Sequence, residues 1–184
     1  ENIEPNPIES RILESPCVKQ VMVVGQDRKT LAALVVPEMD GDVVLGGDHG
    51  DLRLAGNSGD VAVQHNHGSV EIGRTAGNLA LNSNHSNLNV DEVVKAASVN
   101  ANHGRLKLRR IGGDLVANSH HAPLEVDEIH GNAVANNDHG PISITQVLGD
   151  LTVNTNHSPV SVGSTGGNLN LANNQITDIS ALSG

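Results

Sequence analysis

Histidine returns at a fixed interval along most of this chain, and it is the residue type here best suited to metal or acid–base chemistry. Seven histidines lie eighteen residues apart: His49, His67, His85, His103, His121, His139 and His157. Imidazole is a common zinc ligand, so neighbouring rings of such a column could share an ion. Two further histidines, His65 and His120, lie one or two residues before column members. The neighbourhoods of His65, His67, His103, His120 and His121 are therefore the best metal candidates.

Our interpretation is nevertheless that the column is structural and that the chain holds no metal. No Asp, Glu or Cys recurs at a fixed place in every repeat to complete a ligand set. A periodic column also offers many equivalent weak sites instead of one tuned site. Metal binding along the His column stays open as an alternative.

The sequence predicts no catalytic residue and no cofactor. Ser and His occur together in "NHS" and "HGS", but neighbours at a repeat corner are not a nucleophile and base with an orienting acid. The lone cysteine, Cys17, excludes an internal disulfide and a cysteine-based zinc cluster. After Pro16, at the end of an expected helix, it is interpreted as a packed small residue and not as a reactive thiolate.

Composition narrows the class further. The 184 residues include no Phe, Tyr or Trp, so the interior must be narrow and filled by aliphatic side chains. A net charge of −10 argues against binding to nucleic acid or to an anionic membrane. No apolar run approaches the roughly 18 residues of a membrane span. No signal peptide is recognised, and a start at Glu1 is compatible with a processed or excised piece.

The elements that carry the histidines form a repeat of eighteen residues. Eight units begin at Gly41, Gly59, Gly77, Lys95, Gly113, Gly131, Gly149 and Gly167. Positions 3 and 5 are apolar in every unit, and positions 12 and 14 are apolar in the first seven, which indicates two short strands per unit. Such a unit cannot bury its own apolar face, so stacking in parallel is expected. Rungs of about 4.8 Å would make a rod roughly 38 Å long.

The predicted fold is therefore mainly β: a parallel β-solenoid of eight coils with a small α/β cap at the N-terminus. A right-handed or flattened coil of two or three sides is favoured. A left-handed hexapeptide helix would need an apolar residue every six positions, which this pattern does not supply. Position 17, with Val93, Ile111, Ile129 and Val147, is expected to add a third inward contact.

Two polar columns are expected to fix how the units stack. Position 6 is Asn in five consecutive units, at Asn82, Asn100, Asn118, Asn136 and Asn154. Stacked amides can hydrogen-bond from coil to coil. The histidines at position 9 are interpreted in the same way, as a ladder at a tight corner, with Gln175 in the last unit.

Five of the seven basic residues of the repeat fall in the fourth unit: Lys95, Arg105, Lys107, Arg109 and Arg110. A phosphate-binding band is one interpretation. The neighbouring units favour a charge ladder instead. Position 15 runs Asp91, Arg109, Asp127, position 16 runs Glu92, Arg110, Glu128, and Lys107 lies beside Glu125 at position 13.

Two kinds of sequence motif, such as "NHGSVEI" and "GDLTVN", alternate over residues 41–166. This pattern resembles the adhesin-like β-solenoid repeats of uncharacterised bacterial proteins. The resemblance implies a bacterial solenoid without known chemistry. The last unit departs from the pattern, because Asp178 occupies an apolar position. Its "LNLANNQITDISAL" looks like a single leucine-rich repeat, and we interpret residues 167–184 as a C-terminal cap with altered register.

Residues 1–40 lack the repeat and are expected to cover the open first coil. Ile8, Ile12 and Leu13 share one face of a predicted helix over about residues 6–15, which Pro16 ends. "VKQVMVVGQ" and "TLAALVVPE" are predicted strands around the turn "DRKT".

The wording of residues 1–37, "ENIEPNPIESRILESPCVKQVMVVGQDRKTLAALVVP", also resembles part of the C-terminal domain of long-chain acyl-CoA synthetases, which are adenylate-forming enzymes. Residues 1–3 match the family motif that follows its hinge. The hinge, the ATP-binding domain and a phosphate-binding loop are not in this sequence, and Lys19 and Lys29 do not match the family's catalytic lysine. The resemblance implies shared ancestry or a fusion, not activity.

The sequence thus indicates a non-enzymatic structural or interaction scaffold. The alternatives are a regulatory or assembly tail of a long-chain fatty-acid–CoA ligase and metal binding along the His column. A protein partner or self-association is expected, and nucleic acid, a membrane span and a small-molecule substrate are not. The ligase resemblance implies a cytoplasmic location, and the adhesin-like resemblance implies the cell surface.

Overall fold

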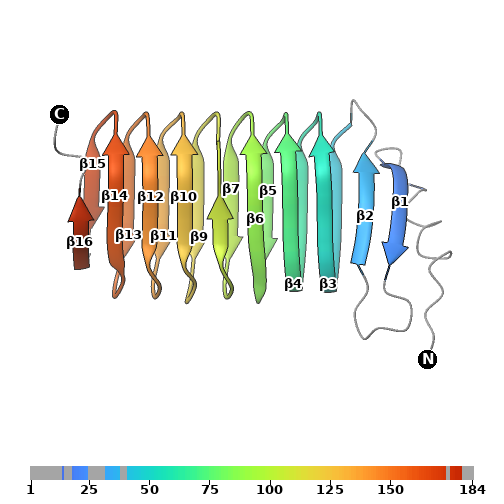
Figure 1. Ribbon diagram of the computed structural model, residues 1–184, viewed down its shortest axis with the longest axis horizontal. Helices are drawn as coiled ribbons and strands as arrows, with labels where there is room; N and C mark the ends of the chain where they lie inside the picture. Colours follow the sequence, from blue (N-terminus) through green and yellow to red (C-terminus); the bar gives the residue numbers. More distant parts are fainter. Residues whose placement is uncertain (1–13, 15–17, 25–31, 38–40, 173–174, 180–184) are drawn as a thin grey trace.

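The computed structural model describes residue 14 and residues 18–24, 32–37, 41–172 and 175–179. A single sheet of sixteen strands coils into a β-solenoid with a repeat of about eighteen residues, which confirms the predicted fold class (Figure 1). No helix occurs among the described residues. It follows that none in this part of the chain is long and apolar enough to cross a membrane.

The solenoid has two faces, and each of its first two coils is one long, bent strand that runs across both faces. These strands are β3 (Val43–Asn57) and β4 (Val61–Thr75). Beyond them, face one holds β5 (Leu79–Ser83), β7 (Ala97–Ala101), β9 (Leu115–Ser119), β11 (Ala133–Asn137), β13 (Leu151–Thr155) and β15 (Leu169–Ala172). Face two, in front in Figure 1, continues with β6 (Ser86–Val93), β8 (Leu106–Leu108), β10 (Leu124–Ile129), β12 (Ile142–Val147), β14 (Pro159–Thr165) and β16 (Gln175–Ile179).

Parallel pairing keeps a constant offset, so that each residue faces its equivalent in the next coil. On face one, Leu79 pairs with Ala97, and Ala97 pairs with Leu115. On face two, Leu88 pairs with Leu106, and Leu106 pairs with Leu124. A column at one repeat position is therefore a physical row of side chains along the rod.

The core is a narrow aliphatic layer between the two faces. Its largest fully buried side chains are leucines and isoleucines such as Leu81, Leu106 and Ile142. The third inward contact expected at position 17 is confirmed, because Val93, Ile111, Ile129 and Val147 are all 0% exposed. Without aromatic side chains, the two sheets approach through aliphatic contacts alone.

The predicted N-terminal hairpin is present. β1 (Val18–Val24) pairs antiparallel with β2 (Ala32–Pro37), and both lie at one end of the row in Figure 1. β2 then runs parallel to β3, from Ala32 opposite Asp51 to Val35 opposite Leu54, so the hairpin extends the face-two sheet. Of the helix predicted over about residues 6–15, only Glu14 is described, in a turn, and the turn "DRKT" and Cys17 lie outside the described residues.

The last unit corrects the eighteen-residue count at one place. Counting puts Asp178 opposite Val160, but the strand pairing puts Ile176 there and Asp178 opposite Ser161. The offset between β14 and β16 falls to sixteen residues and then seventeen, because the connection before β16 is shorter and the register shifts within the pair. Gln175 accordingly pairs with Pro159 and does not continue the His column. The altered register predicted for this unit is confirmed.

Candidate functional site

The seven position-9 histidines form one continuous stack at the corner between the faces. Successive rings have centroids 4.5–5.4 Å apart and interplanar angles of 3–12°. All seven side chains are exposed. Rung spacing sets the ring spacing, because every ring leaves the backbone at the same place in its coil.

Stacked rings of this kind are poorly placed to share a metal ion. Imidazole lone pairs lie in the ring plane, so near-parallel rings direct them side by side instead of toward a common point. Two nitrogens on one zinc ion would also have to come within about 4.2 Å of each other, twice the usual Zn–N length. Among the described residues, no group of three or more His, Cys, Asp or Glu side chains is placed to hold a metal ion.

His65 belongs to a different environment from its column neighbour His67. It sits at position 7, is only 2% exposed, and its Nδ1 lies 3.1 Å from the hydroxyl of Ser86. Burial, which disfavours the charged ring, lowers the pKa of His65. The two histidines therefore point to opposite sides of the corner and do not form a joint site.

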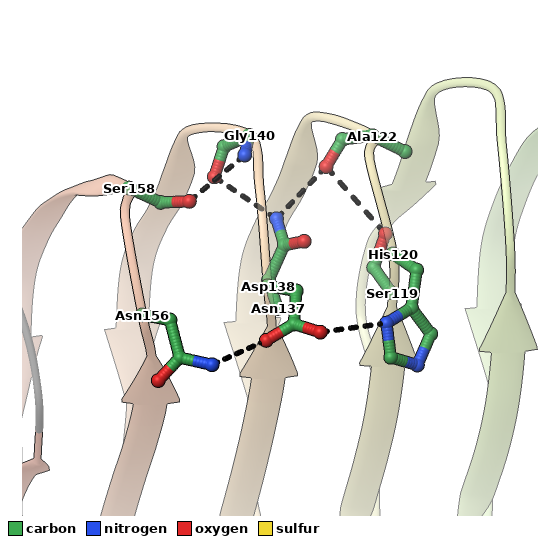
Figure 2. A network of polar contacts seen from close by, with 8 residues as sticks. All are labelled: Ser119, His120, Ala122, Asn137, Asp138, Gly140, Asn156 and Ser158. Carbon is green, nitrogen blue, oxygen red and sulfur yellow. Dashed lines mark hydrogen bonds and ion pairs between the residues drawn. The ribbon is translucent and has the colours of Figure 1, made fainter.

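His120 is part of a row of side chains at position 8, shown in Figure 2. Its Nδ1 lies 3.3 Å from Oδ2 of Asp138, and Asn156 donates to the other carboxylate oxygen at 2.6 Å. The Asn156 hydrogen bond, followed by that of His120, lowers the pKa of Asp138. The structure thus brings His120 to a carboxylate, but the third member of the row is a neutral amide and not a second charged ligand.

The corner behind this row is held by side-chain bonds to backbone groups. Asn137 donates from Nδ2 to the carbonyls of Ala122 and Gly140, both at 2.9 Å (Figure 2). The N–H of Gly140 donates to Ser158 Oγ at 2.8 Å. Turn carbonyls and amides that no strand can pair are satisfied in this way. Position 7 therefore builds the corner, and the exposed or half-buried positions 6, 8 and 9 form surface rows.

The predicted Asn ladder at position 6 is confirmed. From Asn100 onward, each Nδ2 donates to the Oδ1 of the Asn in the preceding coil at 2.7–2.8 Å, and these four bonds join Asn82, Asn100, Asn118, Asn136 and Asn154. Every amide in the interior of the ladder still has one N–H and one oxygen lone pair to offer a ligand. Between this ladder and the position-8 row runs a polar groove, with hollows of about 430 and 240 Å³.

A second ladder, at position 2, was not recognised from the sequence. The side-chain oxygen at this position accepts from the backbone N–H of its equivalent in the next coil: Asp42 from Asp60 at 2.8 Å, and Asp60 from Asn78 at 2.7 Å. The bond from Asn78 lowers the pKa of Asp60. The recurrence of Asp or Asn at position 2 in seven of the eight units is the signal in the sequence that could have predicted this ladder.

Arg105, Lys107 and Arg110 of coil four (95–112) meet opposite charges, whereas the described residues show no ion pair for Lys95 or for Arg109 in the predicted position-15 column. Lys107 lies 3.6 Å from Glu125, as the position-13 column predicts. Arg110 pairs diagonally with Asp91 at 2.8 Å instead of along its own column. Arg110 has a φ of 46°, so its backbone leaves the strand direction, and this explains the diagonal contact.

Beside these cations lies a trough of about 790 Å³ on face two. Its lining comes from coils two to five: Ser69, Val70, Glu71, Asn87, Leu88, Asn89, Gly104, Arg105, Lys107, Arg109, His121 and Pro123. On β6, Asn89 stands between the longer side chains of Glu71 and Lys107, and Asn87 stands between Ser69 and the longer Arg105. The difference in side-chain length makes the trough.

Comparison with known families gives one match, at the N-terminal end. A family model described as the AMP-binding enzyme C-terminal domain matches residues 1–46. No curated protein and no solved structure matches the chain. The match supports the resemblance to acyl-CoA synthetases, and the resemblance of the repeats to adhesin-like solenoids stays a prediction.

The matched segment and the solenoid overlap. The match ends at residue 46, inside β3, whereas the eighteen-residue repeat begins at Gly41. Where it is described, the matched part consists of the β1–β2 hairpin and the first residues of β3. It covers 46 of 184 residues, a quarter of the chain, and the rest of the described chain is a repeat with no counterpart in that match.

Proposed function

We propose that this chain is a non-enzymatic scaffold whose regular surface rows contact a protein partner. The carrying observation is the constant register of the coils. It places the Asn ladder, with bonds of 2.7–2.8 Å, and the stacked histidines on one rigid corner. A surface of this kind repeats the same chemical group at each rung, and extended concave or flat surfaces are how repeat proteins commonly bind partners.

The arrangement of polar groups supports a structural role over catalysis. The position-6 amides bond to one another, and the position-2 oxygens bond to backbone N–H groups of the next coil. The His rings stack on one another and have no position-equivalent acid beside each of them. Catalysis by a nucleophile would require a base within hydrogen-bond reach and a group that orients the base.

A pyrophosphate-release assay tests the non-enzymatic role directly. The pure chain is incubated with ATP, Mg²⁺, coenzyme A and a long-chain fatty acid, with a chain-free mixture as the blank. We expect no release above the blank, because adenylate formation needs nucleotide-binding residues that this sequence lacks. Release that depends on the fatty acid and rises with chain concentration would refute the proposal.

A second candidate, an assembly or regulatory tail of a fatty-acyl ligase, is favoured by the family match over residues 1–46. The parallel pairing of β2 with β3 supports it, because it joins the matched hairpin to the solenoid sheet. The open reading frame upstream of Glu1 separates the two candidates. An adenylate-forming domain encoded directly before this segment would favour the ligase tail, and an unrelated upstream sequence would favour the free-standing scaffold.

A further inference from the structure

The trough on face two has one cationic wall that is only half neutralised. Leu106 and Leu108 of β8 are fully buried, so Arg105 and Lys107 point outward on alternate positions, and Arg109 continues the row. On the coil-five side, Glu125 lies 3.8 Å from Arg105 and 3.6 Å from Lys107, and Asp127 follows it in the row. The cations are therefore flanked by acids on the side away from the trough.

On the coil-three side, which is the trough, the corresponding rung is not acidic. Asn87 and Asn89 stand opposite Arg105 and Lys107 in the β6–β8 register, and both are exposed. Asn87 accepts the backbone N–H of Arg105 at 3.0 Å. Asp91, the next acidic residue on that rung, forms an ion pair with Arg110 at 2.8 Å. Glu71 lines the opposite wall of the trough, but its carboxylate is paired with Arg53 at 3.3 Å.

We propose that this trough binds an extended segment of a protein partner that carries acidic residues at alternate positions. Outward residues of a strand recur every two residues, or about 6.6 Å, and an extended peptide lying along β6 presents its own alternate side chains at the same spacing. Carboxylates on such a peptide would meet Arg105 and Lys107, and the amides of Asn87 and Asn89 would face its backbone. This proposal rests on the interaction role proposed above and names the partner's chemistry.

The remainder of the surface narrows the choice of ligand. The chain carries a net charge of −10, so a long polyanion such as nucleic acid would be repelled beyond the trough. A short acidic segment meets mainly the local cations, because charges more than about 8 Å apart are largely screened at physiological salt. The trough has room for such a segment, at about 790 Å³.

Fluorescence anisotropy with a labelled peptide of alternating Glu and Ser residues tests the proposal. The comparison peptide has the same composition with its Glu residues in one block.

Three variants of the chain lower its net charge by the same amount. Lys107→Gln removes a cation from the trough wall, and Asn89→Glu places an acidic side chain inside the trough. Arg74→Gln removes a cation outside the trough lining. We expect the alternating peptide to bind more tightly than the block peptide. Lys107→Gln and Asn89→Glu should each weaken its binding about tenfold, and Arg74→Gln by less than about twofold.

Several results would overturn the proposal. These are equal affinity for the two peptides, unchanged binding in Lys107→Gln and Asn89→Glu, or an equal loss in Arg74→Gln. Tighter binding of polyphosphate or of a sulfated oligosaccharide, used as competitors, would overturn the peptide assignment. All three substituted side chains are outward, and a circular dichroism melt of each variant establishes that it is folded. If no anionic probe binds, the trough proposal fails while the pyrophosphate assay still decides the non-enzymatic role.

Discussion

Asn118 shows how a single side chain can fix the stacking of three coils. Its amide donates to Asn100 and accepts from Asn136, each at 2.7 Å. Backbone bonds between parallel strands form in any register, but identical amides meet only when the offset is eighteen residues. A one-residue slip would also turn every buried side chain outward. The ladder therefore adds specificity to the stabilisation that it provides.

Replacing Asn118 by Ala should destabilise the fold more than replacing Asn82 by Ala. Asn118 loses two amide bonds, whereas Asn82 loses the one that it accepts from Asn100. At about 0.5–1.5 kcal/mol for each net hydrogen bond, we expect a loss of about 1–3 kcal/mol for Asn118→Ala and about half of that for Asn82→Ala. Urea unfolding followed by circular dichroism measures both. Equal losses would contradict a ladder in which each amide acts through its neighbours.

Gly68 and Gly46 form a matched pair for testing the turn geometry. Gly68 has a φ of 137°, and a Cβ added there would collide with the carbonyl oxygen of Gly50. An added Cβ at Gly46 would meet no atom within 4 Å. We expect Gly68→Ala to lower the free energy of unfolding by about 1–3 kcal/mol or more. Gly46→Ala should be neutral or slightly stabilising, because Ala is the better strand residue. Similar urea midpoints for the two variants would show that the turn is not constrained.

At the scale of the element, β8 is the shortest strand of face two and the clearest case of alternation. Leu106 and Leu108 are 0% exposed, and Lys107 between them points outward. The core at this level has no aromatic residue or polar partner to receive a misplaced charge. The strand therefore offers inward and outward substitutions one residue apart.

Leu106→Asp should be severe, and Lys107→Ala should leave stability nearly unchanged. The Asp would place an unpaired carboxylate between the two faces, with an expected cost of about 4 kcal/mol or more. Lys107→Ala removes one exposed pair with Glu125, worth about 0–1 kcal/mol. Thermal melts by far-UV circular dichroism distinguish the two. A Leu106→Asp chain that melted like the parent would mean that position 12 is not part of the core.

The period of two and the repeat of eighteen predict most of these elements, because burial of one strand face is a local pattern. The same information could not show that β3 and β4 each continue across both faces, because the repeat pattern is the same in the later coils, which break into two strands. It also assumed coils of equal length, which misplaced Asp178. Of the candidate metal residues, spacing predicted the stacked rings. It could not predict that His65 is buried, because position 7 in the other coils is small or amide.

At the scale of the whole molecule, the His column runs through seven coils and stacks each ring on its neighbours. A row of imidazoles at rung spacing cannot be fully protonated without mutual repulsion. In the centre of the column, desolvation and then the neighbouring histidines lower the pKa of His103. Desolvation also lowers the pKa of the buried His65.

The rod should therefore lose stability as the pH falls from about 7 toward 5. A His whose folded pKa lies below its unfolded value of about 6.5 contributes stability that is present above that value. The contribution is lost as pH falls through the folded pKa, because the unfolded chain then binds more protons. Asp60 and Asp138 also have lowered pKa values, but their effect is lost only below about pH 4 and does not overlap this window. Thermal melts across pH 7 to 5 measure the effect, and melting temperatures that stay flat or rise on acidification would contradict it.

The same melts with and without zinc decide whether the column is a ladder or a metal site. Parallel rings 4.5–5.3 Å apart around His103 do not converge on one point, so micromolar zinc should change the melting temperature little. The double variant His103→Ala with His121→Ala removes two central rings. It should weaken the pH dependence, because fewer like charges then meet on acidification, and His65 should supply what remains. A large, saturable zinc stabilisation with fixed stoichiometry that this variant abolishes would establish a metal site in place of a ladder.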